Sequence, residues 1–333
     1  MPVYKKTERE NFVGMLRGEM PEFLPRYKIV EYTVMPSFMA EGHITPGGGT
    51  DIYGVKYVAE DSAGGGALPE PGKFILTDIR NWRDVIRNPS GIDWQTNARK
   101  DLANADFSKP RLANIHRGFF QSLMSFMGFT EGMCALAEEP EECAALFDYL
   151  CDFAEETLVN MIRYYKLDGV SFADDTAAAQ YPFISLSMYR ELIKPFEMRL
   201  ANIARDNDMP IHVHNCGHCE QFIEDWFDLG ISSWDPAQVS NDLLGIKKKY
   251  GRKLVLCGCW DQQGRISLLD TPDEELRDAL AEYVDTYAPE GAFAYVPYVL
   301  GRRDDPRVIR KNKLFDDFYE DYAKPWYANH PNA

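Results

Sequence analysis

The sequence predicts an α/β fold, a (β/α)8 TIM-type barrel in which parallel strands alternate with helices. From about residue 110 onward, short apolar runs alternate with amphipathic stretches of helical length, which is typical of repeated β/α units. About five or six such units follow one another along the chain. No glycine-rich phosphate-binding turn follows any expected strand, and this favours a barrel over an open doubly wound sheet.

The expected elements follow in order along the chain. Strands are expected at 111–118, 169–174, 210–217, 231–237, 253–261 and 292–301, and helices at 140–165, 187–207, 273–287 and 305–323. The helix at 140–165 carries apolar residues at helical spacing. The helix at 187–207 should kink at Pro195, because proline lacks the backbone N–H that a helix interior needs. Thr271 and Pro272 supply an N-cap and a proline at the first helical position of the next helix.

The first 105 or so residues are less regular than the remainder of the chain. The segments 42–54 and 60–72 are rich in glycine and proline, which is typical of loops. We therefore expect one domain over residues 1–333, with 1–105 as an irregular N-terminal segment over the barrel mouth and 106–333 as the barrel core.

Composition and charge exclude several classes of partner. Hydrophobic residues make up 45% of the chain and charged residues 26%, as in globular proteins. The 36 Lys and Arg minus the 52 Asp and Glu give a net charge of −16, which repels nucleic acid and anionic lipid. No apolar run approaches the ~20 residues that cross a bilayer, and the start, MPVYKKTEREN, does not resemble a secretion signal. We expect a cytoplasmic protein with no nucleic acid and no membrane as partner.

Histidine and cysteine side chains gather at the ends of two expected strands. In HVHNCGHC, His214 and Cys216 are two residues apart and point to the same face of the strand. In CGCWD, Cys259 lies nearest the end of the neighbouring strand. Three such ligands with an open position are typical of catalytic zinc, so we expect zinc at His214, Cys216 and Cys259, with Cys219 as the alternative third ligand. The other interpretation is that these cysteines are small apolar side chains of the core.

Carboxylates stand at comparable strand ends. Asp174 and Asp175 end the run FADD, and Asp261 ends CGCWD. A neighbouring like charge raises the pKa of one of two adjacent carboxyl groups, which suits a proton donor. The alternative for the pair is that one side chain faces inward while the other caps a helix. We take Asp174, Asp175 and Asp261 as the candidate catalytic residues.

Six motifs between about residues 108 and 300 carry a resemblance to a known family. In order they are DGVSFADD, SMYRELIKPF, HVHNCG, NDLLGIKKKYGRKLVLCGCWD, TPDEELRDAL and PEGAFAYVP. This series resembles the uroporphyrinogen decarboxylase superfamily, including its cobamide-dependent methyltransferase branch. TDIYGVKY and LTDIRNWRDVIRNPSGIDW, nearer the N-terminus, are similar to the aryl O-demethylase type, the methyltransferase I component, within that branch.

The resemblance also bears on the site. Uroporphyrinogen decarboxylases have an arginine-rich motif near the N-terminus that binds the tetrapyrrole carboxylates, whereas LPRYKIVEYTVMPSF offers only Arg26 and Lys28. His214 and Cys216 match two zinc ligands of the related methyltransferases. Their third ligand, a cysteine after the last barrel strand, has no counterpart in AYVPYVLG, so Cys259 or Cys219 would have to replace it.

The resemblance implies an enzyme that moves a methyl group from a small methylated donor, an aryl methyl ether, to the cobalt of a partner corrinoid protein. Zinc would polarise the ether oxygen, and Asp174 or Asp261 would protonate it or orient the ring. The cobamide would be carried by the partner, and the family resemblance makes a homodimer plausible. Two alternatives remain: a metal-free decarboxylase that uses Asp174 or Asp175, and a non-catalytic module that binds a tetrapyrrole or corrinoid.

Overall fold

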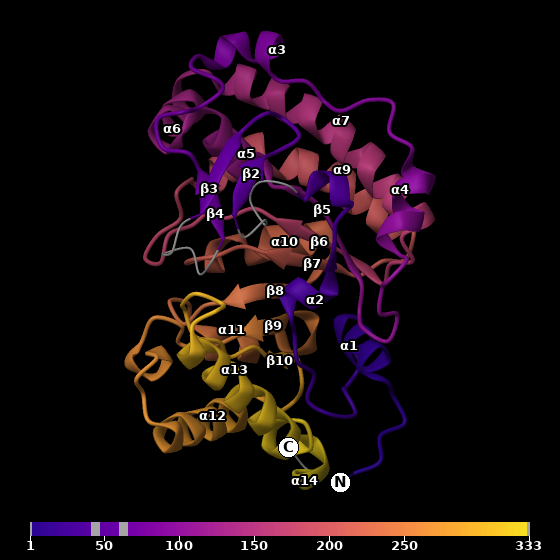
Figure 1. Ribbon diagram of the computed structural model, residues 1–333, viewed down its shortest axis with the longest axis vertical. Coiled ribbons are helices and arrows are strands. Elements are labelled where there is room, and N and C mark those ends of the chain that lie inside the picture. Colours follow the sequence, from indigo (N-terminus) through magenta and orange to yellow (C-terminus); the bar gives the residue numbers. More distant parts are fainter. Residues whose placement is uncertain (1, 41–46, 60–65, 332–333) are drawn as a thin grey trace.

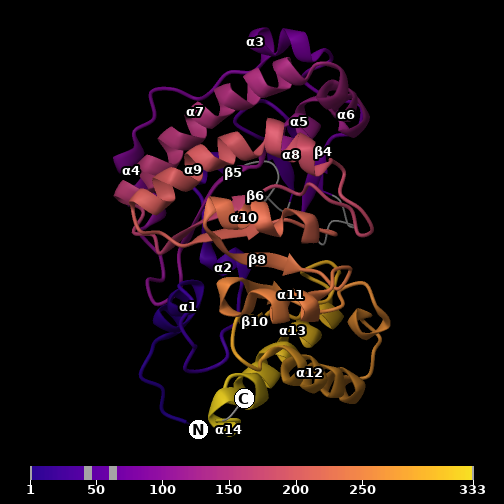
Figure 2. The same cartoon turned by 180° about the vertical axis from the view of Figure 1, so that it is seen from behind.

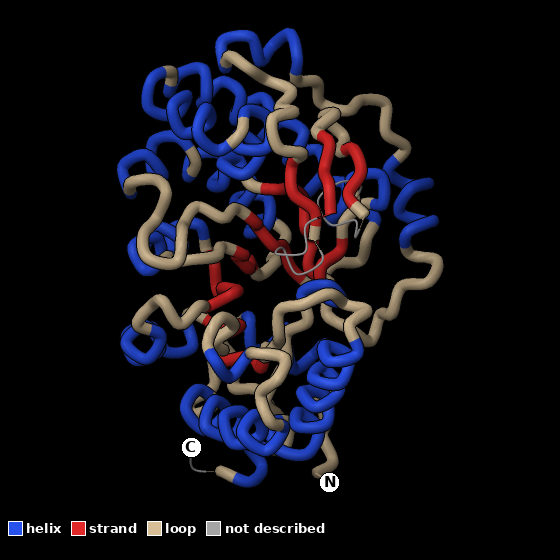
Figure 3. The backbone as a smooth tube through the Cα atoms, turned by 60° about the vertical axis from the view of Figure 1, so that its left-hand side comes forward, coloured by secondary structure: helices blue, strands red, loops and turns tan. Residues whose placement is uncertain are grey.

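A curled parallel sheet of seven strands lies at the centre of the computed structural model, which describes residues 2–40, 47–59 and 66–331 (Figure 1). The strands are hydrogen-bonded in the order β1-β5-β6-β7-β8-β9-β10. Their bounds are β1 Thr33–Val34, β5 Leu112–Arg117, β6 Gly169–Ala173, β7 Ile211–His214, β8 Ile231–Ala237, β9 Val255–Gly258 and β10 Phe293–Tyr295. Figure 3 shows these strands at the centre of the molecule, with helices around them. The predicted parallel β/α arrangement is therefore present, with seven strands in the part of the chain that the structure describes.

The N-terminal segment contributes to both edges of this sheet. β1 pairs in parallel with β5, through Thr33 opposite Leu112. A few residues earlier, the backbone N–H of Tyr27 donates to the carbonyl of Tyr295 in β10 at 3.1 Å, and the N–H of Tyr295 donates to the carbonyl of Pro25 at 2.9 Å. Residues 25–34 therefore supply β1 at one edge of the curled sheet and contact β10 at the other edge.

Helices cover the outside of the sheet. After β5 they are α5 Phe119–Met127, α6 Phe129–Glu138, α7 Pro140–Tyr164, α8 Leu186–Leu192, α9 Lys194–Asp206, α10 Ile223–Leu229, α11 Leu243–Tyr250, α12 Asp273–Tyr287, α13 Pro306–Phe318 and α14 Trp326–Asn329. Figures 1 and 2 show α7 and α9 beside the β5 and β6 half and α11, α12 and α13 beside the β9 and β10 half, with both chain termini near α14. In the described residues, no helix combines the length and the apolar character needed to span a bilayer.

Two local features show how the sequence sets these helices. The predicted helix at 187–207 is two helices, because Pro195 stands at the start of α9 and the chain turns at Ile193. The helix predicted at 273–287 is present as α12, Asp273–Tyr287, but Pro272 rather than Thr271 stands at the N-cap position. The Thr271 hydroxyl donates to the carbonyl of Arg265 at 2.8 Å, and so it does not cap the helix.

The core lies between the helices and the sheet. α7 buries an unbroken stripe that includes Leu146, Leu150, Leu158 and Met161, which are fully buried. Truncation of one such leucine to alanine typically costs about 2–5 kcal/mol of stability. This stripe packs α7 against β5 and thereby holds the carboxyl end of that strand in place.

The N-terminal segment before β5 packs on the same core. It begins with α1 Glu8–Leu16 and α2 Ile29–Tyr32, and it includes a three-stranded antiparallel sheet of β2 Gly48–Thr50, β3 Lys56–Ala59 and β4 Ala67–Pro69. The short helix α3 Trp82–Val85 and the helix α4 Trp94–Asp101 follow. Val55 and Ile79 belong to the same buried cluster as Phe126 of α5. The predicted loops 42–54 and 60–72 lie partly outside the described residues, and their described parts contain the strands β2 and β4, which corrects the prediction there.

Candidate functional site

Three side chains with metal-ligating atoms converge at the carboxyl ends of β6 and β7. One ligand atom each from Asp175, His214 and Cys216 lies within 4.8 Å of the others. The Nε2 atom of His214 is 3.7 Å from Oδ1 of Asp175 and 3.9 Å from Sγ of Cys216. All three residues are partly exposed, so a ligand can reach them.

Backbone pairing brings these strand ends together. Ala173 of β6, His214 of β7 and Asp235 of β8 are register partners across the parallel sheet. The pairing continues past the strands, since the N–H of Asp174 donates to the carbonyl of His214 at 3.0 Å and the N–H of Asn215 donates to that of Asp235 at 2.9 Å. Register partners on adjacent strands point to the same face, which places His214 beside Asp235.

Asp235 bridges two histidines. Its Oδ2 lies 2.8 Å from Nδ1 of His214, and its Oδ1 is hydrogen-bonded to Nε2 of His212. The other ring nitrogen of His212 lies 2.7 Å from the Ser233 hydroxyl. Because Asp235 occupies Nδ1 of His214, only Nε2 of that ring is directed toward Asp175 and Cys216.

The pKa values of Asp235, His214 and Cys216 follow from how far each is buried and from the groups with which each is paired. Burial acts to raise the pKa of Asp235, but the two imidazoles beside it hold that pKa well below its usual range. Burial acts to lower the pKa of His214, but Asp235 raises it well above the usual value. Burial raises the pKa of the Cys216 thiol, and the adjacent His214 opposes this change. The pairing therefore favours the charged forms of His214 and Asp235, and burial favours the thiol form of Cys216.

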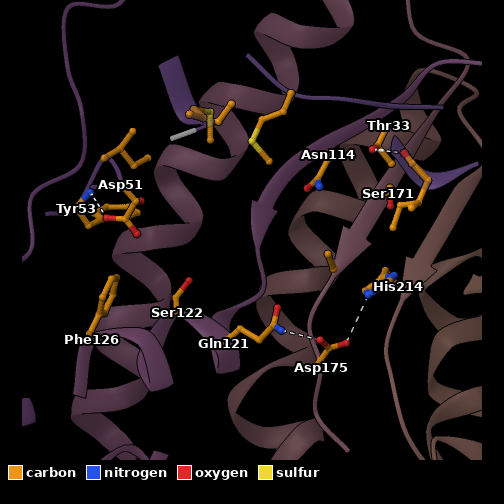
Figure 4. Close-up of a pocket in the computed structure, with 16 residues that line it drawn as sticks. Thr33, Asp51, Tyr53, Asn114, Gln121, Ser122, Phe126, Ser171, Asp175 and His214 are labelled. Carbon is orange, nitrogen blue, oxygen red and sulfur yellow. Dashed lines mark hydrogen bonds and ion pairs between the residues drawn. The ribbon is translucent and has the colours of Figure 1, made fainter. Parts of the chain in front are cut away.

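Asp175 is held in place from two sides. The side-chain amide of Gln121, in α5, donates to its Oδ2 at 2.8 Å (Figure 4). The backbone N–H of Cys216 donates to its Oδ1 at 2.8 Å. These bonds fix the carboxylate so that Oδ1 faces Nε2 of His214.

The donor set fits zinc. Tetrahedral zinc with bonds of about 2.0–2.3 Å places neighbouring ligand atoms roughly 3.3–3.8 Å apart. The 3.7 and 3.9 Å separations around Nε2 of His214 are close to this range. One carboxylate, one imidazole and one thiolate leave a fourth position open, as in catalytic zinc sites. The carboxylate on the far nitrogen of the histidine is the usual outer partner of such a ligand.

Asp174 has a different place from its neighbour. Its two carboxylate oxygens accept the backbone N–H groups of Phe120 and Gln121, both at 2.9 Å, at the start of α5. Burial raises the pKa of Asp174 well above the usual value, and the two N–H bonds act in the opposite direction. Gly118 permits this contact, because a Cβ atom there would lie 1.9 Å from Cγ of Asp174. Of the two adjacent aspartates, one therefore caps a helix and the other faces the site.

The remaining predicted residues lie apart from the group of three. Cys219 is buried, and its thiol contacts the carbonyl of Cys216 at 3.2 Å. Cys259 is buried in the main apolar cluster, where burial raises its pKa and nearby Lys247 acts to lower it. Neither sulfur joins a group of three ligand atoms in the described residues. Asp261 is exposed and accepts the backbone N–H of Gly264 at 2.8 Å, which closes a turn.

Two cavities meet at His214. The inner cavity, about 160 Å³, lies under the N-terminal segment, and Figure 4 shows its wall. The wall includes Asp175, His214, Gln121, Asn114, Phe126, Met35 and Met39. A larger cavity, about 690 Å³, is lined by His214, Cys216 and Asp235 and by residues that follow β10, such as Tyr298. The candidate ligands therefore stand between two spaces.

The sequence alone did not establish the role of every residue of the site. Asp235 lies near the end of an expected strand, which made it a candidate, but its contact with both histidines depends on the register of β7 and β8. Gln121 lies on a helix with no motif around it, and Asn114 lies inside a strand. No signal in the sequence indicated those two.

Comparisons with known proteins agree with this architecture. Residues 118–299 match the family model of uroporphyrinogen decarboxylase (URO-D), which is more than half of the chain. A methyltransferase from Methanosarcina mazei has a similar structure, with a TM-score of 0.59 and 12% sequence identity over 95% of this chain and 100% of that chain. At this identity the likeness concerns the fold. No curated protein gives a significant match. The predicted family is confirmed: the chain belongs to the uroporphyrinogen decarboxylase family.

Proposed function

We propose that this protein is a methyltransferase that moves a methyl group from a small aryl methyl ether to the cobalt of a partner corrinoid protein. The observation that carries the proposal is the group Asp175, His214 and Cys216 beside a cavity. The methyltransferase with a similar fold and the family membership support the same class of enzyme.

We assign the metal ligands to these three residues. The sequence favoured Cys259 or Cys219 as the third ligand, and we propose Asp175 in that position because its Oδ1 is oriented toward His214. When bound there, zinc would act as a Lewis acid on the ether oxygen, which otherwise leaves as a strongly basic anion. Asp235 holds the imidazole of His214 in the orientation that this role needs.

The inner cavity suits the methyl donor. Its volume of about 160 Å³ is close to that of a cavity that holds one benzene ring. Phe126, Met35 and Met39 supply apolar walls, and Gln121 and Asn114 supply polar groups for ring substituents. A donor in this cavity would place its methyl ether beside Asp175 and His214.

The larger cavity suits the approach of the acceptor. It reaches His214 and Cys216 from the side of β9 and β10, whereas the inner cavity reaches His214 from the side of β5 and β6. The cobamide of the partner supplies the nucleophilic cobalt. Displacement at a methyl carbon needs the leaving group and the nucleophile on opposite sides, and two spaces that meet at the candidate ligands provide such an arrangement.

We further propose that the sheet closes as a (β/α)8 barrel. Residues 25–34 supply the missing contact between β10 and β5, through Tyr27 at one edge and Thr33 at the other. The carboxyl ends of the strands would then form one mouth, where such barrels place their active sites.

The alternative of a decarboxylase for a polycarboxylate substrate has less support. Arg26 lies 3.6 Å from Glu8 and 3.4 Å from Asp316, and Lys28 lies 3.3 Å from Glu31. These cations are paired with carboxylates of the protein, so they do not form a clamp for substrate carboxylates.

The direct test is methyl transfer in solution. The protein is mixed with a reduced corrinoid protein and a panel of methoxyarenes, and methyl-cobalt formation is followed by its absorption spectrum. We expect about one zinc per chain and a signal that is lost in Cys216→Ala. Cys134→Ala, at an exposed cysteine, is the matched control and should behave like the unaltered protein. Activity that survives both chelation and Cys216→Ala would contradict the proposal.

A further inference from the structure

An outer cavity of about 500 Å³ adjoins the inner one. It lies between the segment that carries β4 and the helices α5 and α6, and its wall is largely apolar. The wall includes Leu68, Phe74, Phe120, Met124, Phe129 and Phe183. No Lys or Arg lines it in the described part of the chain, and Asp175 is its one charged wall residue there.

The outer cavity adjoins the candidate site. Gln121 and Asp175 line both the inner and the outer cavity. The hydrogen bond between them, 2.8 Å from Nε2 of Gln121 to Oδ2 of Asp175, lies at the boundary. A molecule bound in the inner cavity with one end at Asp175 would reach the outer cavity by displacing the side chain of Gln121.

Three phenylalanines give the outer cavity an aromatic wall. The rings of Phe120 and Phe183 are stacked, with centroids 5.9 Å apart and an interplanar angle of 8°. Phe129 meets Phe183 edge to face at 4.9 Å and 73°. Such walls favour a further aromatic ring, because offset-stacked and edge-to-face contacts add to the gain from apolar burial.

The rim of this cavity carries exposed apolar side chains. Phe129 is 49% exposed and Leu68 is 45% exposed. Both side chains line the cavity as well as its rim, so they extend its apolar wall to the surface. A ligand that enters the groove would cover both residues.

The volumes of the inner and outer cavities limit what each can bind. The inner cavity of about 160 Å³ accommodates one ring, and a second ring of the same molecule needs the adjoining space. The absence of Lys and Arg from the described wall, and the carboxylate of Asp175, disfavour a negatively charged second ring.

We propose that the outer cavity binds the second, uncharged ring of a two-ring aryl methyl ether. This inference rests on the proposed function, because it takes the methyl-bearing ring to occupy the inner cavity. It specifies the donor class as an ether with a neutral aromatic substituent that reaches past Gln121.

The test measures binding directly, so that it does not depend on methyl transfer. Isothermal titration calorimetry compares 2-methoxyphenol with 2-methoxyphenol that carries a benzyl group on the ring. We expect the benzyl derivative to bind about 10-fold more tightly to the unaltered protein. Phe129→Ser should remove most of this gain and leave the affinity for 2-methoxyphenol within about two-fold.

The chain offers a matched control. Phe107→Ser makes the same substitution at a phenylalanine that is 38% exposed and does not line the outer cavity. It should leave the affinities for both ligands unchanged. Leu68→Ser, at the opposite rim, is a second variant that should also weaken binding of the benzyl derivative alone.

The outcomes separate this inference from the proposed function. Equal affinities for the two ligands, or equal effects of Phe129→Ser and Phe107→Ser, would overturn the assignment of the outer cavity. If the benzyl derivative binds as expected but no methyl group reaches cobalt, the outer cavity stands as a ring-binding site and the methyltransferase proposal fails. If 2-methoxyphenol is demethylated while the benzyl group brings no gain in affinity, the methyltransferase proposal stands and the assignment of the outer cavity fails.

Discussion

The carboxylate of Asp235 lies 2.8 Å from Nδ1 of His214, and this contact leaves the other ring nitrogen directed toward Asp175 and Cys216. Both carboxylate oxygens of Asp235 are bound to histidines, Oδ2 to His214 and Oδ1 to His212, so Asp235 acts on the three candidate ligands through His214. It is a positioning residue, and its effect should appear in metal affinity before it appears in stability.

Replacement of Asp235 tests this role. We expect Asp235→Asn to weaken zinc binding by about 10- to 100-fold, because the amide no longer fixes the imidazole as a charged acceptor does. Competition with a chromophoric zinc chelator measures the affinity. Asp278→Asn, at an exposed position of α12, is the control and should bind zinc like the unaltered protein. Equal affinities of the two variants would remove Asp235 from the site.

A second prediction concerns the contact between Gly118 and Asp174. A methyl group at residue 118 would lie 1.9 Å from Cγ of Asp174, so Gly118→Ala must displace the carboxylate that caps α5. We expect a loss of about 1–3 kcal/mol in the free energy of unfolding, measured with urea. Gly47→Ala is the control, because no atom of the described residues beyond its chain neighbours lies within 4 Å of the position of its added Cβ. A loss below about 0.5 kcal/mol for Gly118→Ala would show that the helix start tolerates the change.

Glu197 makes the stability depend on pH. Burial raises the pKa of this carboxyl group from 4.5 to about 7, while the bond from the Tyr189 hydroxyl, at 2.5 Å, and the charge of Lys194 act to lower it. The native state therefore binds a proton that the unfolded state has lost between these two pH values. The free energy of unfolding should fall by at most about 3 kcal/mol as the pH rises from about 4.5 to about 7, and it should then level off.

The variant Glu197→Gln isolates this contribution. We expect it to flatten the fall in unfolding free energy over that pH range, because glutamine keeps the shape of the protonated acid and does not titrate. Glu191→Gln, at an exposed position of α8, should retain the pH dependence of the unaltered protein. Urea unfolding at a series of pH values measures both, and parallel curves for the two variants would exclude Glu197 as the cause.

The alternation of strands and helices could be predicted from the sequence, because this alternation depends on local patterns of apolar and polar residues. β8 coincides with its predicted bounds, and β6 and β7 lie within three residues of theirs. The last predicted strand, 292–301, is only Phe293–Tyr295, because Val296 and the residues after it leave the sheet and line the larger cavity. An apolar run shows burial, but it does not show where pairing ends.

The candidate site was only partly visible for a different reason. His214 and Cys216 lie together because residues two apart on a strand share a face. Which of Asp174 and Asp175 faces inward depends on the turn after β6 and on Gly118, which is far away in sequence. The place of Cys259, outside the group of Asp175, His214 and Cys216 and in the apolar cluster, depends likewise on tertiary packing. Spacing predicts neighbours within one element better than it predicts contacts between elements.

Asn114 connects stability with donor binding. It lines the inner cavity, and its Oδ1 is buried without a hydrogen-bond partner among the described residues. A buried acceptor without a partner costs about 1–3 kcal/mol, so Asn114→Leu, which introduces a side chain of similar volume, should raise the free energy of unfolding by about 1 kcal/mol.

The same change should weaken binding of 2-methoxyphenol and leave the affinity for methoxybenzene unchanged, because only the former has a hydroxyl that can donate to this oxygen. Urea unfolding and calorimetry measure the two effects, with Asn202→Leu, at an exposed position of α9, as the control. A gain in stability with unchanged affinity for both ligands would mean that Asn114 has no part in donor recognition.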